Sequence, residues 1–259
     1  MKQERVKYRE CPLCSSLNIP SFVIGDCSSY PRYVETLSSK IVWNKCEDCT
    51  HVFTEGYYTE EALKLILKQT HKNQKVGANL EKNRLISSRI INQITPFHRR
   101  GVWLDVGFGN GSLIFTASEY GFETVGLDLR EQTVNAMKNL GFDCYQKDIC
   151  DFSCQKDISV ISMADVLEHT HFPKDVLLAA KKLIKKKGAL FLSMPNSDSF
   201  IWKITSQKNV NPYWGEMEHY HNFSRTRLFT LLESVGFTPV SYSISERYRM
   251  CMEIVAISE

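Results

Sequence analysis

The sequence predicts an α/β protein built on a doubly wound, mostly parallel sheet, with a small metal-binding module before it. After residue 100, short apolar runs typical of buried strands alternate with helical patterns. A glycine-rich turn, GFGNG at 107–111, follows the first of these runs, and two CxxC pairs lie within the first 55 residues. At 259 residues, the chain is long enough for one full α/β core and a small additional module.

The first hundred residues divide into two parts. Up to about residue 55 the polarity is irregular and helical periodicity is weak, so local propensity alone predicts little stable structure there. Apolar residues then recur at helical spacing between 59 and 95, and Pro96 ends the pattern, which predicts two connecting helices. We therefore expect a metal-binding module over 1–55, a helical connector over 56–100 and one large domain over 101–259.

The large domain is expected to follow its alternating pattern. The predicted strands are 102–106, 123–128, 143–146, 158–163 and 189–194, and the predicted helices are 112–120, 131–140 and 173–186. The lysine run at 181–187 is interpreted as a solvated helix end that Gly188 terminates. A helix at 224–235, with Ser224 as its cap, precedes strands at 238–245 and 249–258. Their short connection predicts an antiparallel pair at the sheet edge.

Charge and cysteine usage exclude several classes of protein. The net charge is only +3 and the charges are interspersed, which disfavours nucleic acid as a partner. The amino terminus is charged throughout, and no stretch reaches the roughly 18 apolar residues of a membrane span. Nine cysteines, an odd number, suit a reducing compartment better than a disulfide framework. We expect a cytoplasmic protein without membrane contact.

The turn after the first strand of the large domain is a candidate cofactor site. Backbone N–H groups are available where such a strand turns into its helix, and Gly107, Gly109 and Gly111 occupy this turn. Their GxGxG spacing differs from the GxGxxG spacing that cradles a dinucleotide pyrophosphate. Asp128 closes the next strand, where a carboxylate reaches a ribose diol. The pattern favours another nucleotide-like cofactor; the alternative is a tight turn that binds no ligand.

Five segments in order resemble the motif series of class I S-adenosylmethionine-dependent methyltransferases. They are LDVGFGNGSL, GLDLR, QKDIC, ISMADVLEHTHFPKDVL and KKGALFLSMPN, and the similarity covers roughly residues 100–259. The resemblance implies a Rossmann-like, seven-stranded sheet with an antiparallel edge strand. Phe108 departs from the family's pattern, in which a small residue or cysteine is common.

The resemblance also implies which residues bind the cofactor. Asp105 and the glycine turn would line its methionine portion, Asp128 would bind the ribose hydroxyls, and Leu129 would lie against the adenine. Asp148 and Ile149 would meet the adenine edge and face. Ala164 and Asp165 would close the site beside the methionine. The full set is Asp105, Gly107, Phe108, Gly109, Asn110, Gly111, Asp128, Leu129, Asp148, Ile149, Ala164 and Asp165.

The two CxxC pairs predict a structural zinc site. Cys11 and Cys14 in CPLC, and Cys46 and Cys49 in CEDC, supply four thiolates for a tetrahedral zinc ion with bonds of about 2.3 Å. Four protein ligands leave no open position, so the metal is expected to fold the module and to take no part in chemistry. The alternatives are reduced surface thiols and, less favoured, a redox pair. Similar zinc ribbons precede the catalytic domain in chains that resemble sugar C-methyltransferases, but those chains are longer.

His219 is the candidate catalytic residue. It lies with Glu218 and His221 in EMEHYHNFSR, expected to be a loop, and a methyl transfer needs a group that takes the acceptor's proton near neutral pH. The EHxxxFS pattern resembles the segment of related small-molecule methyltransferases in which a histidine is the proposed base, and that histidine maps onto His219. The alternative is a histidine that only fixes the loop by hydrogen bonding, a role we favour for His221.

A second acidic and histidine group, DVLEHTH, resembles the ELEH-type segment of ubiquinone-pathway O-methyltransferases. In those proteins acidic residues and a histidine can hold a divalent cation, which here would involve Asp165, Glu168 and His169. The favoured alternative is that Glu168 and His169 cap and orient the following helix. Trp202, Tyr213 and Trp214 either wall an acceptor pocket or pack beneath a loop.

The leading hypothesis is a methyltransferase that acts on a small-molecule acceptor by in-line displacement. The acceptor classes considered are a sugar, a nucleotide sugar and a quinone-like phenol, and the sequence leaves the acceptor atom and the oligomeric state open. The rival is a zinc-ribbon interaction or nucleic-acid-binding protein whose methyltransferase-like domain does not catalyse. A nicotinamide-dependent oxidoreductase is disfavoured by the glycine spacing.

Overall fold

The computed structural model describes residues 4–67 and 74–259, which form two compact units. The first, called the cysteine unit, contains the described parts of Met1–Gln69, Glu168–Lys174 and Pro195–Leu228. The second, called the sheet unit, contains the described parts of Thr70–Leu167, Asp175–Met194 and Phe229–Glu259. Residues 68–73 of the predicted connector lie outside the described residues.

The sheet unit is built mainly from the elements that follow residue 79. In chain order these are α2 Leu80–Ile94, β6 Val102–Val106, α3 Ser112–Glu119, β7 Glu123–Leu127, α4 Glu131–Asn139, β8 Asp143–Tyr145, the 3₁₀ turn η2 Ile149–Asp151, β9 Ile158–Ala164, α5 Pro173–Leu183, β10 Ile184–Pro195, α7 Arg225–Ser234, β12 Phe237–Ile244 and β13 Cys251–Ser258. Ser224 Oγ accepts from Arg227 N at 3.0 Å, which confirms it as the cap of α7.

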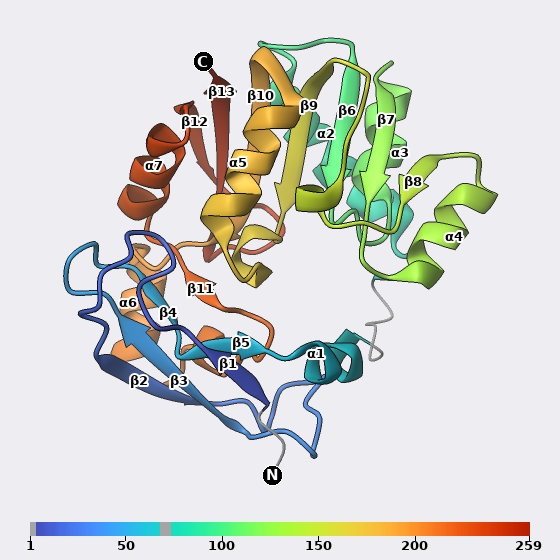
Figure 1. The fold of residues 1–259 in the computed structure, drawn as a ribbon. Coiled ribbons are helices and arrows are strands. Elements are labelled where there is room, and N and C mark those ends of the chain that lie inside the picture. Colours follow the sequence, from blue (N-terminus) through green and yellow to red (C-terminus); the bar gives the residue numbers. More distant parts are fainter. Residues whose placement is uncertain (1–3, 68–73) are drawn as a thin grey trace. The chain divides into compact units, whose positions relative to one another are not determined.

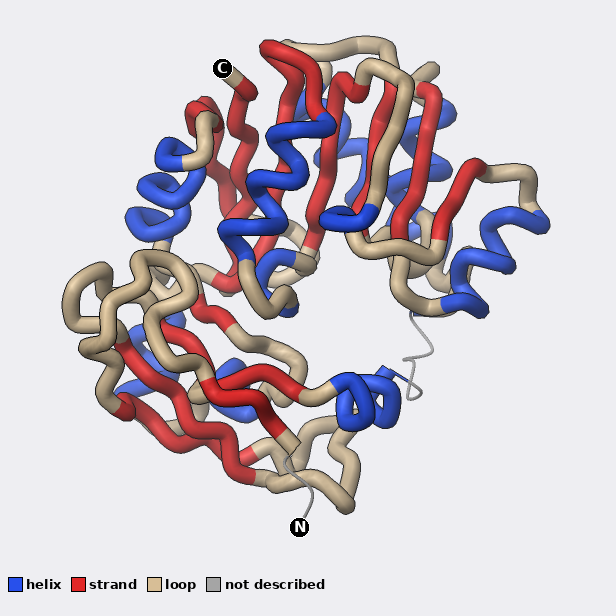
Figure 2. Tube along the Cα trace, viewed as in Figure 1, coloured by secondary structure: helices blue, strands red, loops and turns tan. Residues whose placement is uncertain are grey.

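The central sheet has seven strands in the order β12-β13-β10-β9-β6-β7-β8. β10, β9, β6, β7 and β8 pair in parallel, and β12 pairs with β13 antiparallel at one edge. The chain runs from β6 outward to β8 on one side and returns to β9 on the other. The order therefore reverses between β6 and β9. In Figure 1 α5 lies in front of the sheet and α2 and α3 lie behind it, and Figure 2 shows the strands between these helices. The predicted Rossmann-like, doubly wound sheet with an antiparallel edge is confirmed.

Burial explains why the strands of this sheet are recognisable in the sequence. Every residue of β6 is buried, as are the first six residues of β9, because helices cover both faces of a parallel sheet. Apolar side chains of α2 and α3 pack on one face. That core contains Ile90, Ile91, Ile94, Trp103, Leu113, Ala117, Phe122, Val160, Ala189, Phe191 and Val255.

The boundary between α5 and β10 differs from the prediction. The helix ends at Leu183 and the strand begins at Ile184, so most of the lysine run lies on the strand rather than at a helix end. Ile184 is buried and pairs with Ile158, whereas Lys185, Lys186 and Lys187 are exposed. The apolar residue thus starts the strand early, and Gly188 lies within that strand.

The cysteine unit has its own sheets and its own core. Its elements are β1 Arg5–Lys7, β2 Ser21–Asp26, β3 Lys40–Lys45, β4 Val52–Thr54, β5 Gly56–Tyr58, α1 Glu60–Leu67, η3 Leu167–His169, whose last two residues belong to it, α6 Phe200–Gln207, η4 Pro212–Gly215 and β11 His221–Asn222. One sheet has the order β11-β4-β3-β2, and β1 pairs with β5. Trp43, Tyr58, Met217 and Tyr220 belong to one buried cluster, so residues after 195 complete a core begun near the amino terminus.

One expectation for this unit needs correction, and another agrees with the structure. The segment before α7, expected to be a loop, contains β11, which pairs antiparallel with β4. The described part of the first 55 residues contains the strands β1 to β4, and β5 and β11 from outside this segment complete their sheets, in agreement with the expectation that local propensity alone does not hold the segment together. Within the described part of the chain, no helix is long and apolar enough to cross a membrane.

Candidate functional site

The glycine turn links β6 to α3 and brings backbone into close contact with its surroundings. Gly107, Gly109 and Gly111 have φ values of 67°, 57° and 78°, a region that side chains with a Cβ rarely adopt. At Gly107 an added Cβ would come within 2.6 Å of Val166 Cγ2. Asn110 Oδ1 accepts from Ser112 N at 3.1 Å and so fixes the start of α3. The turn can therefore present backbone, not side chain, to a ligand.

Asp128 lies directly after β7 and is bonded to the glycine turn. Its side chain is buried, and Oδ2 accepts from Gly109 N at 3.2 Å. Arg130 donates from Nε to Oδ1 at 2.9 Å and from Nη2 to Oδ2 at 2.6 Å, and its backbone N donates to Oδ1 at 2.9 Å. These four bonds fill the roughly four acceptor positions of a carboxylate. A ribose diol on Asp128 would therefore displace part of the arginine's contact.

Asp105 is a buried carboxyl at the end of β6. Ser162 of the neighbouring β9 donates from Oγ to Asp105 Oδ1 at 2.6 Å and accepts from Trp103 Nε1 at 2.8 Å. Burial raises the pKa of Asp105 to about 7, although the Ser162 hydrogen bond and the charge of Arg247 oppose that rise. A carboxyl that titrates near neutrality can accept a hydrogen bond from an ammonium group.

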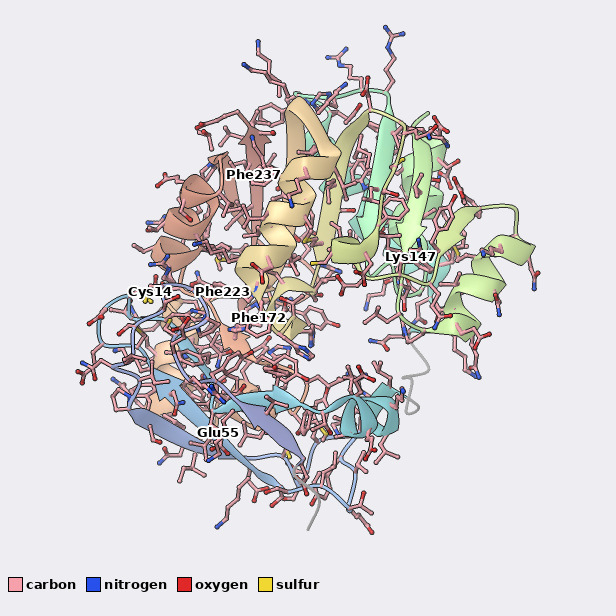
Figure 3. All side chains as sticks on the ribbon, viewed as in Figure 1. Cys14, Glu55, Lys147, Phe172, Phe223 and Phe237 are labelled. Atoms are coloured by element: carbon pink, nitrogen blue, oxygen red, sulfur yellow. The ribbon has the colours of Figure 1, made fainter. Side chains whose placement is uncertain are left out.

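The residues expected near the adenine lie around the ends of β7 and β8. Leu129 follows Asp128 and is 49% exposed. Asp148 accepts from Cys150 N at 2.8 Å and caps η2, while Ile149 is buried. Lys147, labelled in Figure 3, precedes this cap. Phe108 lies in a buried cluster with Ile114, Val134, Met137 and Cys144.

Ala164 and Asp165 end β9 and lead into the next turn. Asp165 has a φ of 58° and accepts from Ser193 Oγ at 3.1 Å. Arg247, from the connection between β12 and β13, places Nη2 3.3 Å from Asp165 Oδ2. Sequence reasoning missed Arg247, because neither a motif nor a periodic pattern marks an arginine in that connection.

The four cysteines of the two CxxC pairs meet in the cysteine unit. Cys11 Sγ lies 3.6 Å from Cys49 Sγ, and Cys14 Sγ lies 3.6 Å from Cys46 Sγ. All four sulfurs lie within 4.8 Å of one another. A zinc tetrahedron with bonds of about 2.3 Å has edges of about 3.8 Å, so the spacing fits this metal. Figure 3 labels Cys14, the exposed member of the cluster.

The two cysteine turns share one backbone geometry. Cys11 N donates to Ser16 O, and Cys46 N donates to His51 O. Each pair is followed by a non-glycine residue with positive φ, Ser15 at 59° and Thr50 at 61°. Hydrogen bonding by Cys11 lowers the pKa of Cys49 to about 5, so the cluster favours thiolate at this position. Two equivalent turns that converge their sulfurs are what a four-cysteine metal site requires.

His219 is held among polar and aromatic groups of the cysteine unit. Its Nε2 lies 2.7 Å from Glu216 Oε2, and its side chain is almost fully buried. Its ring packs edge-on against His169 at 4.5 Å and stacks on Tyr213 at 5.8 Å, which in turn stacks on Trp202 at 5.2 Å. The carboxylate of Glu216 orients the imidazole, as a carboxylate does for a histidine base.

Glu168, His169 and His219 form a second group with metal-ligand chemistry. Each offers one ligand atom, and these atoms lie within 4.8 Å of one another. Burial lowers the pKa of His169 well below its usual value, and the charge of His219 adds to this effect, so the ring is neutral. Asp165, grouped with Glu168 and His169 in the sequence analysis, belongs to the sheet unit and pairs with Ser193 and Arg247.

His221 has a structural environment. It lies on β11 and is fully buried; Nδ1 lies 3.0 Å from His51 Nε2 and Nε2 lies 3.0 Å from Thr170 O. Phe223, labelled in Figure 3, packs against both rings. Burial lowers the pKa of His221 to about 3, so the ring stays neutral. These contacts tie β11 to β4 and agree with the positioning role favoured for this residue.

The expected site residues thus form separate groups. The sheet unit holds all twelve expected cofactor residues, and the cysteine unit holds the four cysteines and His219. Within the sheet unit, a hydrogen bond from Gly109 N to Asp128 Oδ2 connects two of these residues directly.

Comparison with known proteins identifies the family. A family model described as a methyltransferase domain matches residues 79–242. Two similar curated proteins are ubiquinone biosynthesis O-methyltransferases. The one from Idiomarina loihiensis is 27% identical over 128 residues, which cover 46% of this chain and 53% of that protein. The one from Vibrio atlanticus is 27% identical over 165 residues, which cover 57% and 70%. The chain spans about half the length of the first relative.

Solved structures share the fold at low sequence identity. The 1,6-didemethyltoxoflavin-N1-methyltransferase of Burkholderia thailandensis, with bound 1,6-didemethyltoxoflavin and S-adenosylhomocysteine, has a TM-score of 0.59 and 17% identity, and the match covers 82% of this chain and 97% of that one. Magnesium protoporphyrin IX methyltransferase from Synechocystis has a TM-score of 0.56 and 16% identity, with 69% and 84% covered. Because the family model covers more than half of the sequence, the chain belongs to the methyltransferase-domain family and carries a class I S-adenosylmethionine-dependent methyltransferase domain.

Proposed function

We propose that this protein transfers a methyl group from S-adenosylmethionine to a small-molecule acceptor. The observation that carries the proposal is the hydrogen bond from Gly109 N to Asp128 Oδ2, which joins the glycine turn and the ribose-binding acid in one site. The site lies at the carboxyl ends of β6 and β7, next to the point where the strand order reverses. Ligands of open α/β sheets bind at such points.

The residues of the sheet unit fit the parts of this cofactor. Asp128 would bind the ribose hydroxyls, and the glycine turn would present backbone N–H groups to the chain that joins ribose to methionine. Asp105, with Ala164 and Asp165, would meet the amino-acid end. Leu129 and Ile149 would lie against the adenine, and Asp148 would meet its edge. The cofactor supplies a methyl group already activated by a sulfonium centre, so the protein has mainly to orient the acceptor and take its proton.

His219 would take that proton. The carboxylate of Glu216, whose Oε2 lies 2.7 Å from His219 Nε2, would orient the imidazole for this transfer. Among a sugar, a nucleotide sugar and a quinone-like phenol, we propose a quinone-like phenol as the acceptor. The two curated relatives, both named ubiquinone biosynthesis O-methyltransferases, support the same class.

A structural zinc ion completes the proposal. Cys11, Cys14, Cys46 and Cys49 would hold it, and a full set of four sulfur ligands leaves it no catalytic position. We assign it to the module of residues 1–55, followed by the connector of 56–100 and the methyltransferase domain of 101–259. The metal would fix the two cysteine turns and, through Cys46 and His51, the start of β4.

The assignment of Asp128 gives the sharpest test of the cofactor site. Asp128→Ala removes charge-assisted hydrogen bonds worth about 1.5 to 3 kcal/mol each, so the affinity for S-adenosylhomocysteine should fall about tenfold or more. Arg130→Met should leave that affinity unchanged or raise it, because the arginine occupies the same carboxylate. Calorimetric titration measures both variants.

Asp151→Ala is the matched control, since Asp151 is an exposed aspartate of η2 outside the expected site. It should bind S-adenosylhomocysteine as the wild type does. An Asp128→Ala protein with undiminished affinity would show that Asp128 does not bind the ribose.

A further inference from the structure

Arg247 is a partly buried cation in the connection between β12 and β13. Its side chain is 25% exposed. Nε and Nη2 are buried, and neither atom has a hydrogen-bond partner among the described residues. The connection is closed by bonds from Ser245 N to Cys251 O and from Cys251 N to Tyr248 O, and Arg247 N donates to Ser245 Oγ at 3.2 Å. The backbone thus holds Arg247 in a defined place.

The arginine faces acids at the ends of two adjacent strands. Its Nη2 lies 3.3 Å from Oδ2 of Asp165, which follows β9. Burial raises the pKa of Asp105 on β6 and the charge of Arg247 opposes that rise, so the guanidinium lies within electrostatic range of both carboxyls. Burial lowers the pKa of Arg247, but the charges of Asp165 and of a third acid, Glu253, outweigh burial and raise it. The carboxylate of Glu253 already accepts a hydrogen bond from Gln93 Nε2.

In its ion pair with Asp165, Arg247 does not use the two parallel N–H donors of its guanidinium group. Arg130 shows what a saturated pair looks like in this protein, with two donors at 2.6 and 2.9 Å on Asp128. Arg247 approaches Asp165 with one nitrogen at 3.3 Å and makes no hydrogen bond there, while Ser193 Oγ donates to the other oxygen of Asp165. Buried N–H groups without acceptors are costly, which points to an external acceptor with two oxygens.

The chemistry of the surrounding groups identifies that acceptor. Two carboxyls beside an arginine match an α-amino acid, whose ammonium bonds to carboxylates and whose carboxylate takes a guanidinium in a bidentate pair. The register places β9 two strands from β7, so this group lies about 10 Å from the Asp128 position. This separation is similar to the length of a ligand that carries a ribose at one end and an amino acid at the other.

We propose that Arg247 binds the α-carboxylate of the methionine portion of S-adenosylmethionine, while Asp105 and Asp165 face its ammonium group. This inference rests on the proposed function. It adds a residue from the connection between β12 and β13 to a site whose other residues lie at or after the ends of β6, β7, β8 and β9.

The test compares two ligands that differ only in the carboxylate. S-Adenosylhomocysteine and its decarboxylated analogue, S-adenosyl-3-thiopropylamine, are titrated calorimetrically into the full chain. The wild type should prefer S-adenosylhomocysteine by about tenfold to a hundredfold, the range for hydrogen bonds between charged groups. Arg247→Met should bind the two ligands with nearly equal affinity, and Arg247→Lys should keep part of the preference because it retains the charge but loses the fork.

Binding of the analogue reports whether each variant is folded, because the analogue needs the rest of the site and not the arginine. Arg249→Met, an exposed arginine of the same connection, is the matched control and should keep the full preference. An Arg247→Met protein that keeps the preference, or that loses affinity equally for both ligands, overturns the inference while leaving the proposed function intact. A wild type that binds neither ligand overturns the proposed function itself.

Discussion

The buried carboxyl of Asp105 predicts a pH-dependent stability that a single substitution removes. Burial raises its pKa from the usual 3.8 to about 7, so the folded state holds the proton more tightly than the unfolded state. The stabilisation is therefore fully present below about pH 4 and is lost as the pH rises through about 7. The pKa difference corresponds to a change on the order of 4 kcal/mol in the free energy of unfolding.

Asp105→Asn should eliminate this dependence. The amide cannot ionise, yet its oxygen can still accept the hydrogen bond from Ser162 Oγ. The difference in unfolding free energy between wild type and variant should therefore shift by about 4 kcal/mol, in favour of the variant, between pH 4 and pH 8. Buried histidines such as His51 and His221 titrate in both proteins, so their contributions cancel in the difference.

Native-state hydrogen exchange of the β6 and β9 amides measures this quantity in the unit that contains Asp105. It also avoids the assumption that both units unfold together. Asp151→Asn provides the control, with a difference from wild type that does not change over this range. A constant difference between wild type and Asp105→Asn from pH 4 to pH 8 would mean that Asp105 titrates alike in the folded and unfolded chains, contrary to this prediction.

Two further predictions concern the cysteine unit. Elemental analysis should find about one zinc per chain after purification without chelators, and Cys14→Ser should lower that content whereas Cys154→Ser, outside the cluster, should not. Chelation should raise hydrogen exchange in β2, β3 and β4 before β6 and β9, and a zinc content well under one would contradict the site. His219→Gln should lower turnover by about 10² to 10⁴ without changing the affinity for S-adenosylhomocysteine, and Glu216→Gln, which loses the orienting carboxylate, should show a smaller loss. Full turnover in His219→Gln would limit this residue to positioning the segment.

The sheet unit is readable from sequence because its elements are local and strongly buried. β6 and the first six residues of β9 are short, mostly apolar and buried runs, and Gly107 and Pro173 mark boundaries between strands and helices. Asp128 follows β7 and the glycine turn follows the adjacent parallel strand β6, so both are expected at the same edge of the sheet. The bond from Gly109 N to Asp128 is a consequence of that topology.

The cysteine unit is less readable because its elements depend on distant partners. β11 has two residues and exists only by pairing with β4, more than 160 residues earlier. No periodicity is visible in a strand of that length. The aromatic residues Tyr213 and Trp214 were a signal that the segment is buried; Trp43 Nε1 donates to Trp214 O at 3.0 Å and Trp214 packs edge-on against Trp43. The sequence does not indicate which of these aromatic residues line an acceptor pocket and which pack beneath a loop.

The side-chain partners of two arginines near the proposed cofactor site, Arg130 and Arg247, are not predictable from the sequence. Arg130 follows Asp128 by two residues, yet the sequence does not indicate that its guanidinium turns back onto that carboxylate. Arg247 reaches Asp165 across about 80 residues of chain, and only the hairpin that contains it determines where it lies. Side-chain pairing of this kind is set by tertiary packing, which no local pattern encodes.

Calorimetric titration of the wild-type chain with S-adenosylhomocysteine and, in the same buffer, with NADH distinguishes the two classes of cofactor. We expect one S-adenosylhomocysteine bound per chain and no binding of NADH, because the GxGxG turn and its bond to Asp128 suit a ribose without a pyrophosphate. Binding of NADH with no binding of S-adenosylhomocysteine would contradict the cofactor assignment and every residue role that depends on it.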